Sequence, residues 1–264
     1  MPGNLRALIL GDVVGQSGCR ALYMNLGKIK KACQADIVIA NGENATEGKG
    51  IAVQDLEGLF KSGVDVVTSG NHIWQKREIL PLLESEERLL RPENYPPGVP
   101  GKGVYVGVFK GVTVAVCNLM GRVQLPDLRC PFRTGKELAG RLQKEASVRI
   151  FDFHAEWPQE KEALALYLDG SVSAVVGTHT HVQTADERIL PHGTAFMTDI
   201  GMTGPAESVI GMDVETAVKR HLSQMPLKMS VAKGAARMSG VVVDVDVASG
   251  KAVAIERFSE VSSL

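Results

Sequence analysis

The chain has 264 residues, of which 44% are hydrophobic and 22% are charged, and its formal net charge is −1. These values are typical of a globular α/β protein and exclude disordered and fibrous classes. Because the net charge is close to zero, no overall basic field collects nucleic acid or an anionic membrane, and the charge does not indicate an RNA partner. We expect a single domain over residues 1–264 whose affinity for phosphate, if it has one, is local.

The N-terminus and the cysteines bear on the compartment. The first ten residues carry only a short apolar run that lacks the architecture of a cleavable signal peptide, and no stretch approaches the roughly 18 apolar residues that a membrane span requires. The four cysteines contain no CxxC pair, which argues against a zinc ribbon or a redox motif. We therefore expect a cytoplasmic protein with reduced thiols and no membrane partner. The cysteines are Cys19, Cys33, Cys117 and Cys130.

Short apolar runs rich in Val and Ile alternate with helix-like stretches along most of the chain, and this order predicts a largely parallel, layered sheet. The runs lie at 5–10, 35–40, 64–68, 148–153 and 172–177. The helix-like stretches lie at about 18–33, 54–62, 76–84, 134–146 and 159–169. Two hairpins interrupt the alternation, one at 103–108 with 112–119 and one at 240–247 with 251–258.

The segment at about 118–135, which follows the first hairpin, contains several Pro, Arg and Gly residues, and we predict that it forms a flap over the active site. Arg122, Arg129 and Arg133 in this segment are either contacts to a phosphate or base, or solvated loop charges.

Five polar clusters each come directly after an apolar run. They are GDVV at 11–14, NGEN at 41–44, SGNH at 69–72, DFHA at 152–155 and GTHTH at 177–181. Asp, Glu, Asn and His are ligands of hard or borderline divalent cations, and ligands bind at the carboxyl ends of strands in α/β sheets. Each cluster alone could be a turn, a helix cap or a satisfied core histidine. Five such clusters at the ends of five strands of one sheet instead favour a two-metal hydrolase.

The spacing of His179 and His181 is informative. On an extended strand end, residues i and i+2 project to the same side, so both imidazoles can face adjacent metals while Thr178 and Thr180 face away. The alternative is a solvated polar loop after Gly177.

Nucleotide-binding loops are a rival explanation. The glycines of GDVVGQSG at 11–18 do not have GxGxxG spacing, and GENATEGKG at 42–50 has neither the spacing nor the Ser or Thr of a P-loop. A dinucleotide-binding enzyme or an NTPase is therefore disfavoured.

The motifs GDVVG, NGEN, SGNH, DFHAE and GTHTHVQTAD resemble, in this order, the five motifs of calcineurin-like metallophosphoesterases, and most closely those of the YmdB-like bacterial phosphodiesterases. NLMGR at 118–122 and TDIGMTGP at 198–205 also look like that branch. The resemblance implies a layered α/β/β/α sandwich with mixed sheets, and it makes a homo-oligomer reasonable.

The resemblance also implies two metal ions, iron or manganese, with zinc left open. Asp12, Glu43, Asn44 and His181 would bind one ion, and Glu43, Asn71, His154 and His179 the other, with Glu43 as the bridge. The usual first motif of the superfamily is Asp-x-His, but Val14 stands at the histidine position here, and Glu43 replaces the usual bridging Asp. These departures match the YmdB-like branch, in which Asn44 compensates for the missing ligand.

The activity implied is hydrolysis of a cyclic nucleotide, 2′,3′- or 3′,5′-cyclic AMP, by a metal-bridging hydroxide, with His72 as the general acid that protonates the leaving alkoxide. Two other functions stay open. One is a regulatory protein that binds a nucleotide or an RNA end with little turnover, and the other is a broad phosphomonoesterase.

Overall fold

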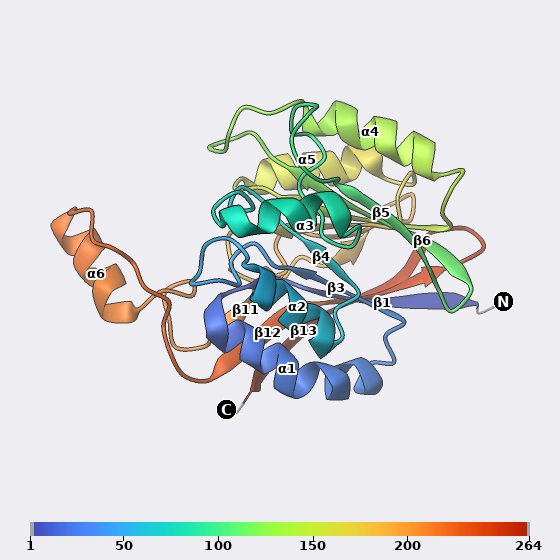
Figure 1. Cartoon of the computed structure of the whole chain (residues 1–264). Coiled ribbons are helices and arrows are strands. Elements are labelled where there is room, and N and C mark those ends of the chain that lie inside the picture. Colours follow the sequence, from blue (N-terminus) through green and yellow to red (C-terminus); the bar gives the residue numbers. More distant parts are fainter. Residues whose placement is uncertain (1–2, 263–264) are drawn as a thin grey trace.

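The strands form two mixed β-sheets. The structure, a computed structural model, describes residues 3–262, and within these residues a seven-stranded sheet lies against a six-stranded sheet (Figure 1). The order of the first sheet is β2-β11-β12-β1-β3-β4, with β13 paired to β12. Its strands are β1 (Asn4–Leu10), β2 (Asp12–Val13), β3 (Ile37–Asn41), β4 (Val66–Thr68), β11 (Met202–Pro205), β12 (Ala236–Asp246) and β13 (Ala252–Ser262).

The second sheet has the order β5-β6-β7-β8-β10-β9. Its strands are β5 (Val104–Phe109), β6 (Val112–Met120), β7 (Val148–His154), β8 (Ala174–Thr178), β9 (Arg188–Ile189) and β10 (Ala195–Met197). In the first sheet β1, β3 and β4 run parallel, and in the second β6, β7, β8 and β10 run parallel. The hairpins β5–β6 and β12–β13 are antiparallel, which confirms both predicted hairpins.

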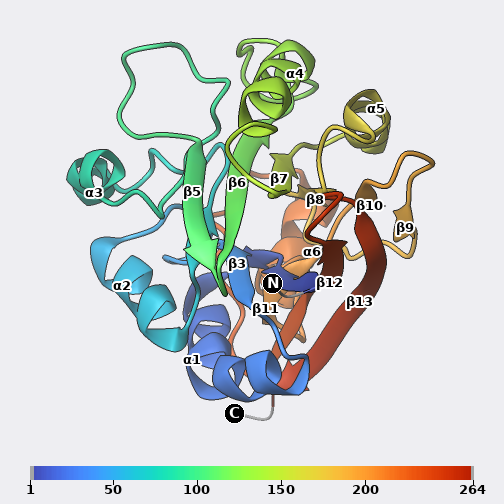
Figure 2. The ribbon, with the colours of Figure 1, turned by 90° about the vertical axis from the view of Figure 1, so that its right-hand side faces the viewer.

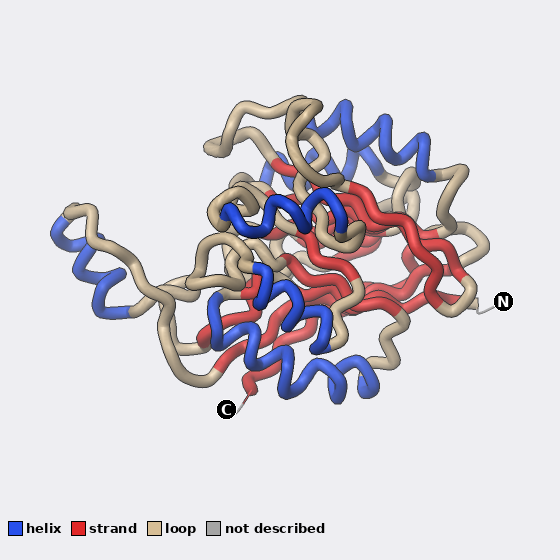
Figure 3. The backbone as a smooth tube through the Cα atoms, viewed as in Figure 1, coloured by secondary structure: helices blue, strands red, loops and turns tan. Residues whose placement is uncertain are grey.

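Helices cover the outer face of each sheet (Figures 2 and 3). The helices are α1 (Gly15–Ala32), α2 (Val53–Ser62), the 3₁₀ helix η1 (Arg77–Ile79), α3 (Leu80–Ser85), α4 (Pro131–Leu142), α5 (Pro158–Leu168) and α6 (Val214–Ser223). In the view of Figure 2, α1 lies at the bottom and α4 and α5 lie at the top, with the strands between them.

The side-chain alternation of β1 builds two cores at once. Leu5 and Ile9 point into the apolar core between the sheets, whereas Leu8 and Leu10 point into the core beneath α1 and α2. On the second sheet, β6 and β7 pack in the same way against α4 and α5. Full burial of each Leu or Ile contributes roughly 1.5–3 kcal/mol, so the three cores hold the layers in place. The predicted α/β/β/α sandwich with mixed sheets is confirmed.

The prediction of one largely parallel sheet is wrong, because the five motif-bearing runs are divided between two sheets. An apolar run without alternation indicates that both faces of a strand are covered, but it does not reveal whether a helix or a second sheet covers each face. The short strands β9, β10 and β11 were also not predicted.

Helix α6 lies in the excursion between β11 and β12, which projects from the two-sheet body at the left of Figure 1. Of its residues only Ala217 is buried, and the sequence analysis did not predict this helix. Within residues 3–262, no helix combines the length and the apolar character needed to cross a bilayer.

Candidate metal centre

The two sheets bring their motif-bearing strand ends to one place. Glu43 and Asn44 follow β3, Asn71 follows β4, and His154 is the last residue of β7. All eight residues predicted for the site lie within hydrogen-bond or ion-pair distance of at least one other member of the group. They are Asp12, Glu43, Asn44, Asn71, His72, His154, His179 and His181.

The first group of contacts surrounds the amide of Asn44. Its Nδ2 atom lies 3.2 Å from Asp12 Oδ1, 3.3 Å from Glu43 Oε1 and 3.1 Å from His181 Nε2. A primary amide has two N–H donors and therefore cannot satisfy three acceptors at once. Three acceptor atoms from three separate segments thus converge on the position of one amide group.

The second group of contacts surrounds the Nε2 atom of His154. This atom lies 3.1 Å from Glu43 Oε1, 3.2 Å from Asn71 Oδ1 and 2.9 Å from His179 Nδ1. Glu43, His154 and His179 can place one ligand atom each within 4.8 Å of one another. Glu43 belongs to both groups, because the same Oε1 atom contacts Asn44 and His154.

The backbone of the GTHTH motif differs from the prediction. β8 ends at Thr178, and both His179, with φ of 103°, and His181, with φ of 66°, have left-handed backbone conformations rather than extended ones. The two imidazoles converge through these turns and not through strand alternation. Thr178 does not face away either, because its Oγ1 atom lies 3.0 Å from His154 Nδ1.

In His154, His179 and His181, the ring nitrogen that points away from the cluster faces an oxygen atom. The other ring nitrogen therefore points into the cluster. His154 Nδ1 lies 3.0 Å from Thr178 Oγ1, whose own proton goes to Asp152. His179 Nε2 lies 3.0 Å from Glu156 Oε2, and His181 Nδ1 lies 2.9 Å from the carbonyl oxygen of residue 210. Each outer nitrogen must therefore donate, so the inner nitrogens, which face into the cluster, are the ones that can bind a metal ion once they carry no proton. Metal-binding histidines have this arrangement.

The electrostatics of the site favour positive charge within it. Asp12 and Glu43 are fully buried, and burial raises a carboxyl pKa, but the neighbouring imidazoles outweigh burial and lower the pKa of both groups. Burial and the charge of His154 lower the pKa of His179 to about 4, so its ring is neutral at pH 7. Burial opposes protonation of His181, but the hydrogen bond and charge of Asp12 raise its pKa to about 9.

His72 lies at the edge of this group. Its Nδ1 atom lies 2.8 Å from Asn44 Oδ1 and 3.4 Å from Glu43 Oε1, and about a quarter of the side chain is exposed, at 25%. Its backbone N–H donates to Glu43 Oε2 at 3.0 Å. Among the described residues 3–262, its Nε2 atom has no hydrogen-bond partner. The ring is therefore oriented by the site and keeps one nitrogen available to a substrate.

Position 70 of the SGNH motif must be a glycine, because the site leaves no room there for a side chain. A Cβ atom at this position would lie 2.2 Å from His154 Cδ2 and 2.5 Å from Glu43 Oε2. Real Cβ atoms do not make such contacts, so any other residue would displace the site.

The sequence analysis missed several residues that hold the cluster. Asp152 accepts hydrogen bonds from Thr178 and Asn41, and burial raises its pKa to about 6. Asn41 also accepts the backbone N–H of Glu43 at 3.1 Å. The available signal was a polar residue inside a buried strand, because Asp152 and Asn41 lie in the same motifs as the predicted residues.

The segment predicted as a flap divides into three parts. β6 continues to Met120, a loop covers residues 121–130, and α4 begins at Pro131. Asn94 donates to the carbonyl oxygens of Met120 and Arg129, which ties the loop to the body. Arg122, Arg129 and Arg133 are exposed, and Arg129 lies 3.7 Å from Glu137.

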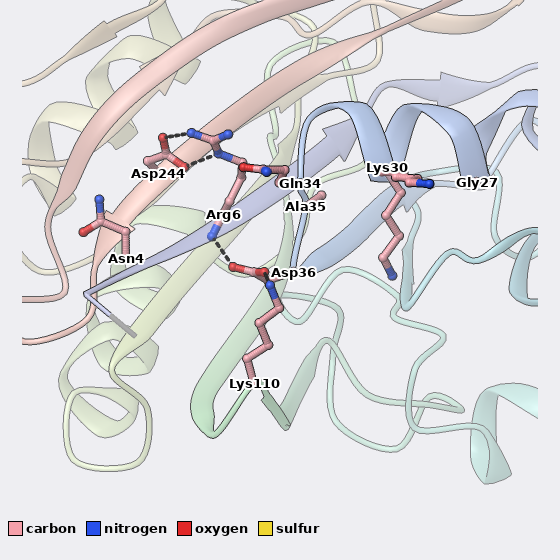
Figure 4. Close-up of a pocket in the computed structure, with 10 residues that line it drawn as sticks. Asn4, Arg6, Gly27, Lys30, Gln34, Ala35, Asp36, Lys110 and Asp244 are labelled. Atoms are coloured by element: carbon pink, nitrogen blue, oxygen red, sulfur yellow. Dashed lines mark hydrogen bonds and ion pairs between the residues drawn. The ribbon is translucent and has the colours of Figure 1, made fainter. Parts of the chain in front are cut away.

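A cavity of about 660 Å³ lies near the amino end of β1 and is lined by Asn4 and Arg6 of that strand (Figure 4). Four cationic residues line it, and three of them are paired with carboxylates, namely Arg6 with Asp244, Lys30 with Asp65, and Lys110 with Asp36. None of the eight residues of the cluster lines this cavity. It is therefore not part of the candidate site.

The donor set fits metal ions. Two buried carboxylates, two amides and the inner nitrogens of three imidazoles lie together, and mixed N/O donors of this kind bind transition metals when the rings are deprotonated. The donors form two groups that share Glu43, which is the arrangement expected for two ions.

Known proteins resemble this chain over almost its whole length. The model of the family described as YmdB-like protein matches residues 8–258. The chain belongs to the YmdB-like family. A 2′,3′-cyclic-nucleotide 2′-phosphodiesterase of Bacillus subtilis is 47% identical over 253 residues, which cover 96% of each chain. This confirms the family resemblance carried by the five motifs.

Two solved structures of similar length share the fold. A hypothetical protein from Thermus thermophilus superposes with a TM-score of 0.92 at 42% identity, over 98% of this chain and 100% of that one. A phosphatase from Mycoplasma pneumoniae superposes with a TM-score of 0.93 at 37% identity, over 100% of this chain and 95% of that one.

Proposed function

We propose that this protein is a dinuclear metal-dependent phosphodiesterase that hydrolyses cyclic nucleotides. The observation that supports it most strongly is the convergence of the inner nitrogens of three imidazoles on a cluster with two buried carboxylates. The Bacillus subtilis relative, a 2′,3′-cyclic-nucleotide 2′-phosphodiesterase, makes a 2′,3′-cyclic nucleotide the first substrate to test. The 3′,5′-cyclic isomer is the second.

In this proposal each of the two contact groups would hold one ion. Asp12, Asn44 and His181 would bind one, Asn71, His154 and His179 would bind the other, and Glu43 belongs to both groups. Iron or manganese suits these mixed donors, and zinc is the third candidate. When bound, two such ions lower the pKa of a water molecule to near neutrality and neutralise the charge of the phosphoryl oxygens.

Asn44 must turn its amide to serve as a ligand. Its nitrogen now faces the cluster and its oxygen faces His72 Nδ1 at 2.8 Å. The two amide atoms are nearly the same size, so a half-turn exchanges them without a change in packing. After this turn Asn44 would donate to His72 Nδ1, which would leave the ring proton on Nε2.

His72 is the proposed general acid. It lies beside the ligand groups, it is partly exposed, and its Nε2 atom can reach a substrate. Protonation of the leaving oxygen by this atom would assist a sugar alkoxide, which leaves poorly without a proton. The chain thus supplies the acid, and the nucleophile would come from a water molecule whose pKa bound ions lower.

Hydrolysis of three substrates by the purified protein, before and after chelation, tests the proposal. The substrates are 2′,3′-cyclic AMP, 3′,5′-cyclic AMP and a phosphomonoester such as 3′-AMP. The proposal predicts cyclic-nucleotide hydrolysis that chelation abolishes and Mn²⁺ or Fe²⁺ restores. Binding of a cyclic nucleotide without turnover at any metal concentration would instead support a regulatory binding protein. Preference for the monoester would support a broad phosphomonoesterase.

A further inference from the structure

The TDIG segment, residues 198–201, joins the two sheets beside the candidate metal centre. It connects β10 of the second sheet to β11 of the first. The backbone N–H of Ile200 donates to the carbonyl oxygen of Gly177 at 2.9 Å, and the proposed mechanism gives the segment no task. It therefore lies where it can set the position of one sheet's ligands relative to the other's.

On the side of the second sheet, Asp199 accepts hydrogen bonds from Thr180. Its Oδ2 atom accepts hydrogen bonds from the backbone N–H of Thr180 at 3.1 Å and from the Thr180 hydroxyl at 2.8 Å. Thr180 stands between His179 and His181. One carboxylate oxygen therefore fixes both the backbone and the side chain of the turn that carries the two imidazoles.

Toward the first sheet, Gly201 holds Asp12. The carbonyl oxygen of Gly201 accepts the backbone N–H of Asp12 at 3.1 Å, and a Cβ atom on Gly11 would lie 1.9 Å from this carbonyl oxygen. Asp199 Oδ1 accepts the backbone N–H of Gly201 at 2.9 Å. The same side chain thus contacts both the turn that carries the imidazoles and the backbone that holds Asp12.

The turn at His179–His181 needs such support. Left-handed φ values are unfavourable for residues other than glycine, and they persist where surrounding contacts determine the backbone. His179 and His181 both have left-handed φ values, and His179 also donates its backbone N–H to Asp12 Oδ2 at 3.1 Å. Without Asp199 the turn would lose two of its hydrogen bonds.

Lys161 of α5 neutralises Asp199 deep in the protein. Its Nζ atom lies 2.7 Å from Asp199 Oδ2, and the exposed fractions of the two side chains are 1% and 0%. A buried ion pair is weak evidence for stability, because an apolar pair of similar size often stabilises a protein as well or better. Its geometric effect is more specific, since only an ionised carboxylate can accept from Lys161, Thr180 and Gly201 together.

We propose that Asp199, neutralised by Lys161, is a positioning residue that fixes His179 and His181 relative to Asp12 and thereby raises the affinity of the cluster for metal ions. This inference rests on the metal centre of the proposed function. It assigns Asp199 and Lys161 no contact with substrate.

The test compares Mn²⁺ binding by the full chain and its variants, measured by titration calorimetry. Thr180→Val removes the hydroxyl donor and keeps the side-chain size, whereas Thr180→Ser keeps the donor. Asp199→Asn removes the charge. Asp169→Asn is the matched control, because Asp169 is also a buried carboxylate that holds a turn, through the backbone N–H groups of His192 and Thr194, but this turn carries no proposed ligand. Circular dichroism melts show which variants are folded.

Loss of an outer-shell partner lowers metal affinity about 10–100-fold. We expect losses in this range for Asp199→Asn and Thr180→Val, with Thr180→Ser and Asp169→Asn close to the unaltered chain. Faster hydrogen exchange of the Thr180 amide in Asp199→Asn is a second expected result. Unchanged Mn²⁺ affinity in a folded Thr180→Val variant, or an equal loss in Asp169→Asn, would overturn the inference. Failure of the unaltered chain to bind Mn²⁺ would instead contradict the metal centre itself.

Discussion

The Nε2 atom of His154 lies 2.9 Å from the Nδ1 atom of His179, and each ring directs its other nitrogen to an oxygen atom of Thr178 or Glu156. Two lone pairs at this distance repel each other unless a proton or a metal ion lies between them. Glu43 Oε1 lies 3.1 Å from the same His154 atom and adds negative charge. The arrangement is thus that of a site built to hold a cation.

Removal of His179 tests its role as a ligand. We predict that His179→Ala lowers Mn²⁺ affinity by at least about 100-fold, because the loss of a direct ligand exceeds the loss typical of an outer-shell partner. His192→Ala is the control, since the His192 side chain is exposed and its ring pairs with Asp169, which is outside the cluster. Elemental analysis and calorimetry measure the effect. Equal metal content in both variants would contradict the assignment.

Removal of His72 tests the general acid. We predict that His72→Ala keeps its metal but hydrolyses 2′,3′-cyclic AMP about 10²–10⁴-fold more slowly, the usual contribution of a general acid. Bis-p-nitrophenyl phosphate should lose much less, because p-nitrophenolate leaves without a proton. The comparison of kcat for the two substrates decides the matter. Equal losses for both substrates, or loss of metal, would show that His72 has another role.

Addition of one methyl group at Gly70 tests the packing of the site. The Cβ atom of Gly70→Ala would lie 2.2 Å from His154 Cδ2, so His154 must move, with a cost of about 1–3 kcal/mol in unfolding free energy and a loss of Mn²⁺ affinity. Gly140→Ala on α4 is the control, because its Cβ atom meets nothing within 4 Å and the helix should gain about 0.5–1 kcal/mol. Chemical denaturation measures both values. A Gly70→Ala variant with normal affinity and stability would be inconsistent with this geometry.

Variants of the buried Lys161–Asp199 ion pair can separate its effect on the free energy of unfolding from its effect on metal binding. We predict that Lys161→Met lowers the unfolding free energy by about 3–5 kcal/mol, because it leaves Asp199 buried without its partner. The double variant Lys161→Met with Asp199→Asn should recover part of this loss, since no uncompensated charge remains. Its Mn²⁺ affinity should stay low. Denaturant titration gives the stabilities, and full recovery of Mn²⁺ affinity in the double variant would contradict a positioning role for the pair.

The sequence predicted that the eight residues converge, but it did not predict the way in which the fold brings them together. The eight residues lie directly after apolar runs, and the carboxyl ends of parallel strands meet at one edge, so their convergence followed from the pattern. The division into two sheets could not be predicted, because a continuous apolar run looks the same whether a helix or a second sheet covers the strand. Short strands such as β9, with two residues, carry too little pattern to detect.

The backbone of the GTHTH motif shows a second limit. Alternation along an extended strand predicted that the imidazoles of His179 and His181 face the same side. Both imidazoles do reach the cluster, but the backbone that carries them is left-handed and not extended. The backbone there donates hydrogen bonds to Asp199, which lies 19 residues beyond Thr180 in the sequence, and to Asp12 near the start of the chain. Local sequence does not contain such long-range contacts. TDIGMTGP resembled the family, but its sequence alone did not reveal what it holds.

The most direct test of the central claim is an anomalous diffraction measurement on crystals of the protein grown with Mn²⁺. A dinuclear centre would give two peaks about 3.5–4 Å apart, one among Asp12, Asn44 and His181 and the other among Asn71, His154 and His179, with Glu43 between them. A single peak, or manganese bound elsewhere while this cluster stays free of it, would contradict the dinuclear centre.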